Sequence, residues 1–161
     1  MNETERLTSE RYTSERFTSA RGWKMLAALT LVGAAAIHVA VTPQHFDEWF
    51  AAGVFFIVLA VAEAVSGAVM ISRVGERAAA RGLVAALTAA TIALWVVSRT
   101  VGLPFGPDPG MPEAIGVLDL TSTGLEALTL LALWALARTP SYRTAVASEP
   151  DAQRYRGDRA A

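Results

Sequence analysis

Four long apolar blocks constrain this chain more than any other feature of its sequence. They cover residues 25–42, 49–72, 82–98 and 115–137, and none contains more than two acidic residues. Each has roughly the 17 to 25 residues that an α-helix needs to cross the hydrocarbon core of a bilayer. Because 53% of the 161 residues are apolar and the mean hydropathy is positive, we expect an integral membrane protein rather than a soluble domain.

The predicted fold is all-α, a bundle of four transmembrane helices in contact with the lipid bilayer. The helices are expected at about 23–42, 49–72, 82–99 and 115–138, which makes residues 23–138 one membrane domain. Residues 1–22 contain the repeat LTSERYTSERFTSAR. Its five-residue period puts the apolar side chains on different faces of a helix or strand, so this segment is predicted to be a disordered tail. The polar residues 139–161 are predicted to be a second disordered tail.

The basic residues indicate how the bundle is oriented. Of the 14 Lys and Arg residues, all but Arg99 lie before residue 25, in the connection 72–81, or after residue 137. Basic segments next to membrane spans stay in the cytoplasm. The sequence therefore predicts a multi-pass protein of the plasma membrane with both termini cytoplasmic and with residues 43–48 and 99–114 outside.

Charge and cysteine content exclude several classes of function. The net charge of −1 gives no reason to expect a nucleic-acid partner. The absence of cysteine excludes disulfides, thiolate metal ligands and cysteine nucleophiles. No serine or threonine has a recognisable neighbouring base and no nucleotide-binding motif is present, so the sequence does not favour an enzyme.

Polar side chains inside the predicted helices are concentrated toward the outer side. With the first helix ending at residue 42, His38 and Asp119 lie about one turn inside the outer boundary, and Glu63 and Glu126 lie deeper, near the middle of the bilayer. A carboxylate in a spanning helix costs about 2.5–3.5 kcal/mol. We expect these acids to be protonated and hydrogen-bonded, to pair with Arg99 or a histidine, or to bind a ligand.

Two groups of residues are candidates for a polar pocket in the outer half of the bundle. The ligand or metal candidates are His38, His45, Glu48, Asp119 and Glu126. The supporting intramembrane residues are Glu63, Arg99, Ser122 and Thr123, of which the last two share a helical stripe with Asp119 and Glu126. Imidazole and carboxylate together suit a divalent ion such as zinc, iron, copper or manganese. A haem is disfavoured, because its two histidines should face each other from separate elements.

The segment 98–120 is predicted to form an ordered extracytoplasmic lid between the third and fourth helices. It contains four prolines and four glycines, which exclude a regular helix, together with apolar side chains that a solvated linker would not need. The lid residues are Pro104, Phe105, Gly106, Pro107 and Glu113. A rigid hairpin without a pocket beneath it is the alternative.

Three stretches resemble an uncharacterised family of small four-helix integral membrane proteins of actinobacteria. They read HVAVTPQHFDEWFAAGVFF, SRTVGLPFGPDPGMPEAIGVLDL and STGLEALTLL, and the likeness covers residues 23–138. Its most specific parts are the H-x6-H-x2-E run from His38 to Glu48 and the SRTVGLPFGP segment. The resemblance implies the four-helix topology and no particular activity.

Three functions are therefore considered. The first is the binding of a small ligand or metal ion in the outer pocket. The second is a non-catalytic accessory subunit that docks on a membrane protein partner through the lid. The third is a proton-coupled carrier of small solutes that uses acids at two depths, for which Gly53, Ala60 and Gly67 would permit homo-oligomer contacts.

Overall fold

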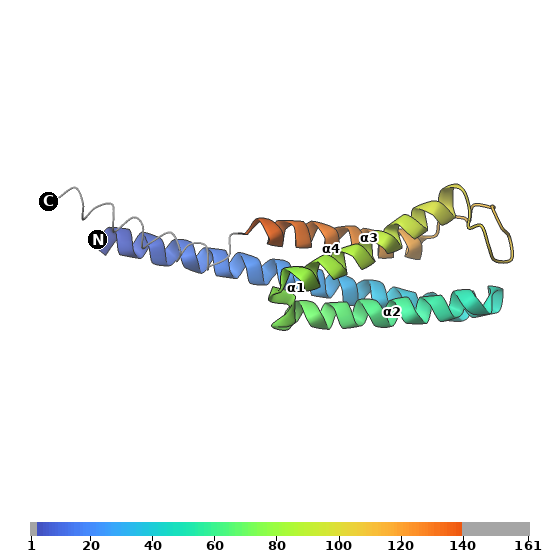
Figure 1. Cartoon of the computed structure of the whole chain (residues 1–161), viewed down its shortest axis with the longest axis horizontal. Helices are drawn as coiled ribbons and strands as arrows, with labels where there is room; N and C mark the ends of the chain where they lie inside the picture. The colour runs from blue at the N-terminus through green and yellow to red at the C-terminus, as the bar shows by residue number, and fades with distance from the viewer. Residues whose placement is uncertain (1–2, 140–161) are drawn as a thin grey trace.

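The computed structural model describes the backbone of residues 3–139 and the side chains of residues 19–139, and this part of the chain is all-α (Figure 1). The elements are α1 (Glu3–Glu48), α2 (Phe50–Ile71), the short 3-10 helix η1 (Val74–Glu76), α3 (Ala78–Thr100) and α4 (Val117–Arg138). Each of the four α-helices contains a segment long and apolar enough to cross a membrane, which in α1 is Ser19–Glu48. The chain is a multi-pass membrane protein, as its apolar blocks predict.

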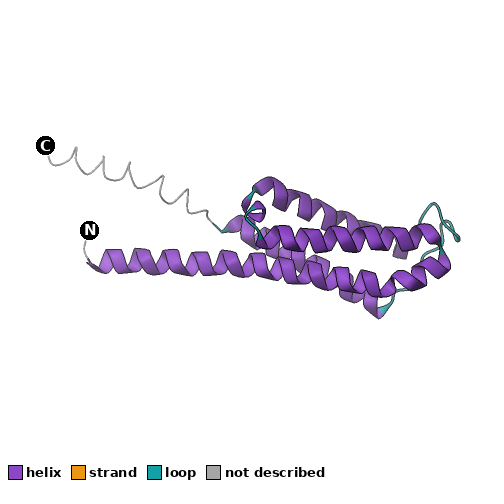
Figure 2. Cartoon of the chain, turned by 90° about the horizontal axis from the view of Figure 1, so that it is seen from below, coloured by secondary structure: helices purple, strands orange, loops and turns teal. Residues whose placement is uncertain are grey.

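The helices lie side by side, each antiparallel to the next along the chain (Figures 1 and 2). α1 packs most extensively against α2 and α4, α3 packs against α4, and α2 and α3 barely touch. One end of the bundle, which we call the turn end, holds η1 between α2 and α3. The other, the loop end, holds residues 101–116 and the junction of α1 with α2.

The exterior of the bundle differs from that of a water-soluble protein, and its interior contains several polar side chains. Large aliphatic side chains such as Leu29, Val58 and Leu83 are more than half exposed, whereas Thr88 and Thr129 are almost completely buried. Lipid tails accept the exposed aliphatic side chains, so polar groups must find partners inside the bundle. The packing therefore places the polar chemistry of the chain at its centre.

Small residues on α2 let α1 approach closely. Gly53, Ala60 and Gly67, which were considered above as a surface for oligomer contacts, are buried inside the chain instead. A side chain at position 67 would lie 3.2 Å from the Ala28 carbonyl oxygen on α1. The stripe therefore serves the contact between α1 and α2, because close backbone approach requires small residues there.

The first helix continues beyond its predicted end. The sequence predicts a loop from Pro43 to Glu48, but α1 runs through Pro43. Proline lacks the N–H that would complete the helical hydrogen bond. Next to it, the Thr42 hydroxyl donates to the His38 carbonyl (2.7 Å) and His45 Nδ1 donates to the Val41 carbonyl (2.9 Å), so side chains add hydrogen bonds on both sides of Pro43.

A single extended residue, Trp49 (φ −161°, ψ 120°), then separates α1 from α2. The turn is this tight because Gly53 leaves room for the Phe46 ring, which would overlap any side chain at position 53. The backbone is also helical from Glu3, where the sequence predicts a disordered tail. Of the predicted C-terminal tail, residues 140–161 lie outside the described part of the chain.

The loop between α3 and α4 is held to the bundle by backbone hydrogen bonds. Glu113 N–H donates to the Ser98 carbonyl (3.0 Å), and Gly110 N–H donates to the Leu103 carbonyl (2.7 Å). Gly102 and Gly110 both have left-handed backbone angles, with φ of 74° and 75°. Both positions favour glycine, which adopts positive φ without steric cost.

Replacing Gly102 with alanine is expected to destabilise the loop more than replacing Gly110. Either change costs about 1–2 kcal/mol for left-handed backbone at a residue with a Cβ. At position 102 the Cβ would also lie 2.5 Å from the Met111 nitrogen, whereas at position 110 nothing lies within 4 Å. The expected extra loss for Gly102→Ala is about 1–3 kcal/mol, because backbone must shift. Thermal unfolding of both variants in detergent measures the difference, and equal losses would contradict the packing described here.

Candidate functional site

Three side chains from three helices meet in the middle of the bundle. His38 on α1 lies between Glu63 on α2 and Glu126 on α4. Its Nδ1 is 2.8 Å from Glu63 Oε2, and its Nε2 is 3.9 Å from Glu126 Oε1. One ligand atom from each of the three residues lies within 4.8 Å of the other two. We call this group the His38 cluster.

All three residues of the His38 cluster are buried. The side chain of His38 is 6% exposed, and those of Glu63 and Glu126 are 2% exposed. Glu126 Oε2 has no hydrogen-bond partner among the residues that the structure describes. Buried polar atoms are almost always paired, so this oxygen is available for a proton, a ligand or an ion.

The cluster lies deeper than the sequence predicts for His38. The sequence places His38 at the level of Asp119 because it expects the first helix to end at residue 42; in the structure the charged partners of His38 are Glu63 and Glu126, and Asp119 lines the same pocket as His38. With α1 ending at Glu48, His38 lies ten residues from the helix end, or roughly 15 Å along the axis. That depth matches Glu63 and Glu126, at roughly 20 Å and 14 Å from the starts of α2 and α4.

Toward the turn end the cluster is closed by packing. The hydroxyl groups of Thr30 and Thr129 share a hydrogen bond of 2.7 Å between α1 and α4. Beyond them the buried residues form an apolar core that contains Ala27, Leu31 and Met70. The cluster is therefore polar on one side and sealed by apolar side chains on the other.

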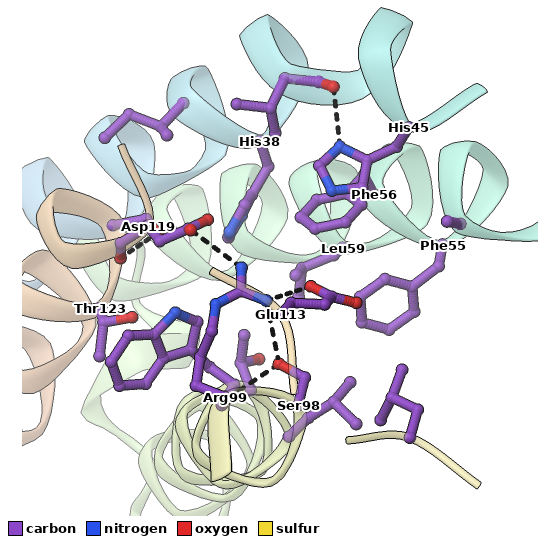
Figure 3. Close-up of a pocket in the computed structure, with 18 of the residues that line it drawn as sticks. His38, His45, Phe55, Phe56, Leu59, Ser98, Arg99, Glu113, Asp119 and Thr123 are labelled. Carbon is purple, nitrogen blue, oxygen red and sulfur yellow. Dashed lines mark hydrogen bonds and ion pairs between the residues drawn. The ribbon is translucent and has the colours of Figure 1, made fainter. Parts of the chain in front are cut away.

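Toward the loop end the cluster adjoins a pocket of about 390 Å³ that all four helices line. Both histidines and Glu126 contribute to its wall, together with aromatic side chains such as Phe55 and Phe56 (Figure 3). Leu103, Phe105 and Glu113 of the loop also line it. A volume of this size is typical of sites for small organic ligands, which range from about 300 to 1,000 Å³.

Arg99 occupies the pocket with its charge balanced by two carboxylates (Figure 3). Its guanidinium donates to Asp119 Oδ2 at 2.9 Å and pairs with Glu113. Asp119 Oδ2 also accepts the Gly116 N–H (2.9 Å) at the start of α4, so the same oxygen caps the helix. Pairing of Arg99 with an intramembrane acid is one of the alternatives expected from the sequence, and Asp119 is that acid; Glu113 of the loop is a second partner.

The remaining candidate residues divide between the pocket and the surface. His45 lines the pocket and lies against the Phe56 ring, with 3.9 Å between ring centroids. Ser122 and Thr123 line it as well, in the stripe that ends at Glu126. Glu48 is exposed and accepts a hydrogen bond from Gln44 (2.9 Å), so it lies away from the other four ligand candidates.

Only some of the residues predicted for the lid contact the pocket. Phe105 lines the pocket and lies near Trp49, with 6.1 Å between ring centroids, and Gly106 lies against the same indole. Pro104 and Pro107 are not part of the pocket wall. Sequence reasoning missed Trp95, whose indole N–H is buried without a partner in the described residues. Its position four residues before Arg99 on one helix face was the available signal.

The arrangement can hold a positive charge or move a proton, because an imidazole ring lies between two carboxyl groups. When Nδ1 donates to Glu63, the lone pair of Nε2 faces Glu126.

The four-helix architecture that the resemblance implies is present. No family model, no curated protein and no solved structure matches this chain.

Proposed function

We propose that this protein binds a divalent transition-metal ion inside the membrane, at the His38 cluster. The observation that carries the proposal is the convergence of His38, Glu63 and Glu126, which are buried and come from three helices, with one potential ligand atom of each within 4.8 Å of the others. Imidazole and carboxylate ligands together suit zinc, iron and manganese. A bound cation would also offset the cost of two carboxyl groups in a membrane interior.

The contacts of His38 give the two glutamates different roles in this proposal. Glu63 accepts the hydrogen bond from Nδ1 at 2.8 Å and orients the imidazole ring. A metal-binding histidine usually donates its second ring N–H in this way. Glu126 Oε1 lies 3.9 Å from Nε2, and two ligands of one tetrahedral zinc ion are about 3.4 Å apart. An ion between Nε2 and Glu126 requires only a small adjustment, and Glu126 Oε2 has no competing partner in the described residues.

A binding role fits the surroundings of the cluster better than a carrier role. A carrier needs a polar route on both sides of its site, whereas the buried residues beyond Thr30 and Thr129 are apolar. On the other side the pocket leads to the loop, where Phe105 and Trp49 lie against each other. In this proposal residues 101–116 act as a lid over the pocket.

Metal content of the purified protein tests the proposal. Protein is expressed with zinc, iron and manganese supplements, purified in detergent without chelators, and analysed by plasma mass spectrometry. We expect one equivalent of metal per chain, removal by a chelator, and recovery on titration of the chelated protein with zinc. Less than a tenth of an equivalent of metal per chain after supplementation, together with no saturable zinc binding, would contradict the proposal that this protein binds a metal ion.

We also propose that the turn end faces the cytoplasm. Lys24 contacts the Ser72 carbonyl (3.4 Å), which places it beside the basic connection between α2 and α3. Basic residues next to spans stay inside. The cysteine-free chain suits labelling of two exposed positions, Val74 at the turn end and Met111 at the loop end. An impermeant maleimide applied to intact cells should label Met111→Cys and spare Val74→Cys. The reverse pattern would invert the proposed orientation.

A further inference from the structure

Two hydrogen-bond donors in the pocket have no acceptor. The indole Nε1 of Trp95 and the guanidinium Nε of Arg99 are buried, and neither has a hydrogen-bond partner among the described residues. Both side chains come from α3, four residues apart, and both line the pocket. A buried donor without an acceptor costs about 1–3 kcal/mol. A ligand that carries acceptor oxygens would recover this free energy.

The rest of the pocket wall indicates an apolar ligand body. Phe55, Phe56, Leu59 and Leu94 line the pocket around the polar groups, and its volume of about 390 Å³ fits a molecule of one or two rings. Aromatic walls favour a planar ligand, because offset or edge contacts between rings add to the burial of apolar area. The pocket thus combines apolar walls with two side chains whose buried donors have no partner in the described residues.

The charges around Arg99 decide between a neutral and an anionic ligand. Its guanidinium already pairs with Asp119 and Glu113, and Glu126 lines the same pocket. A ligand carboxylate or phosphate would add another negative charge to a site where carboxyl groups outnumber the single arginine. A neutral carbonyl oxygen accepts the same hydrogen bonds without that repulsion.

We propose that the pocket binds a neutral, lipid-soluble carbonyl compound, with its oxygens hydrogen-bonded to Trp95 and Arg99 and its ring between the aromatic walls. The inference rests on α3 and on the pocket wall, and not on metal binding at the His38 cluster. We therefore expect the carbonyl compound to bind to the chelated, metal-free protein as well. A negative result for this ligand would leave the metal proposal standing, and a negative result for metal would leave this inference standing.

Three probes with related ring systems test the ligand class. They are 2-methyl-1,4-naphthoquinone, which carries two carbonyls, 2-methylnaphthalene, which carries no acceptor, and 2-naphthoate, which carries an anion. Each is titrated calorimetrically into chelated full-length protein in detergent, with the signal from micelles alone subtracted. We expect saturable 1:1 binding of the naphthoquinone, with the hydrocarbon at least about ten-fold weaker because two hydrogen bonds are lost. Equal affinity of quinone and hydrocarbon, tighter naphthoate binding, or no saturable quinone binding would overturn the proposal.

A matched pair of tryptophan variants assigns the binding to this pocket. Trp95→Phe keeps an aromatic ring and removes the Nε1 donor, so the quinone should bind about three- to ten-fold more weakly. Hydrocarbon binding should weaken less than quinone binding, because both ligands lose the same ring contact and only the quinone loses a hydrogen bond. The control is Trp134→Phe, because Trp134 is 55% exposed, lies under the Arg138 guanidinium and is not part of the pocket wall. Equal effects of the two variants on quinone affinity would refute the assignment to Trp95.

Discussion

Glutamine in place of Glu126 is expected to weaken zinc binding by on the order of 100-fold or more, the largest change in affinity expected from one substitution. Glutamine keeps the size of the side chain and removes the negative charge that attracts a cation. Glu126 faces His38 Nε2 at 3.9 Å and has an oxygen without a partner in the described residues, so it is the proposed direct ligand. Competition between the protein and a zinc-binding dye measures the change in dissociation constant.

The same measurement on two further variants compares the contributions of Glu63 and Glu48 to zinc affinity. Glu63→Gln should weaken zinc binding by about 10- to 100-fold, less than Glu126→Gln, since Glu63 orients the imidazole through Nδ1. Glu48→Gln is the matched control, because Glu48 is exposed and bonds to Gln44, and its affinity should equal that of the wild type. An unchanged melting temperature of the metal-free Glu126→Gln and Glu63→Gln variants would show that weaker binding does not come from unfolding. A large loss in Glu48→Gln with none in Glu126→Gln would place the ion elsewhere.

Leucine in place of Arg99 is expected to lower the free energy of unfolding by about 2–3 kcal/mol. The arginine side chain is 9% exposed and pairs with Asp119 and Glu113, which are 26% and 56% exposed. Removing one partner of a fully buried ion pair costs about 3–5 kcal/mol, and solvent around Glu113 reduces the loss here. Unfolding by a denaturing detergent measures the change.

A double-mutant cycle separates the ion pair from the packing of the arginine stem. Asparagine at position 119 keeps an acceptor for the Gly116 N–H and removes the negative charge. In an Asp119→Asn background, Arg99→Leu should therefore cost at least about 1 kcal/mol less. Arg99→Lys keeps the charge but loses the planar fork, and should fall between the wild type and Arg99→Leu. Identical losses in both backgrounds would show that Arg99 stabilises the bundle through packing alone.

The membrane spans were predictable from the sequence because lipid exposure is a property of each segment by itself. Each of the four apolar blocks corresponds to one helix, and the predicted bounds of α2, α3 and α4 differ from the observed ones by a few residues. The pairing of Arg99 with Asp119 is one of the alternatives that the sequence indicates, because Arg99 is the one basic residue among the outer acids. Both predictions depend on composition and order along the chain.

The partners of His38 were not predictable in the same way, because they depend on where α1 ends. Pro43 is a helix-breaking residue by local rules, yet α1 continues through it, with side-chain hydrogen bonds from Thr42 and His45 on either side. Six additional helical residues move His38 inward by roughly 9 Å, from the level of Asp119 to the level of Glu63. A small error in one helix boundary therefore changed the predicted depth of His38.

The one-residue junction at Trp49 divides the bundle into parts with different freedom to move. α1 and α2 are tied within one extended residue and by the contact of Gly53 with the Phe46 ring, so His38 and Glu63 belong to one rigid hairpin. Glu126 is carried by α4, which joins α3 through the 16 residues 101–116. Capture or release of an ion would then require α4 to move relative to this hairpin. The distance between His38 Nε2 and Glu126 Oε1 would shorten on capture and lengthen on release. Spin labels on α1 and α4 should report a shorter distance in the zinc-loaded protein, while labels on α1 and α2 should report none.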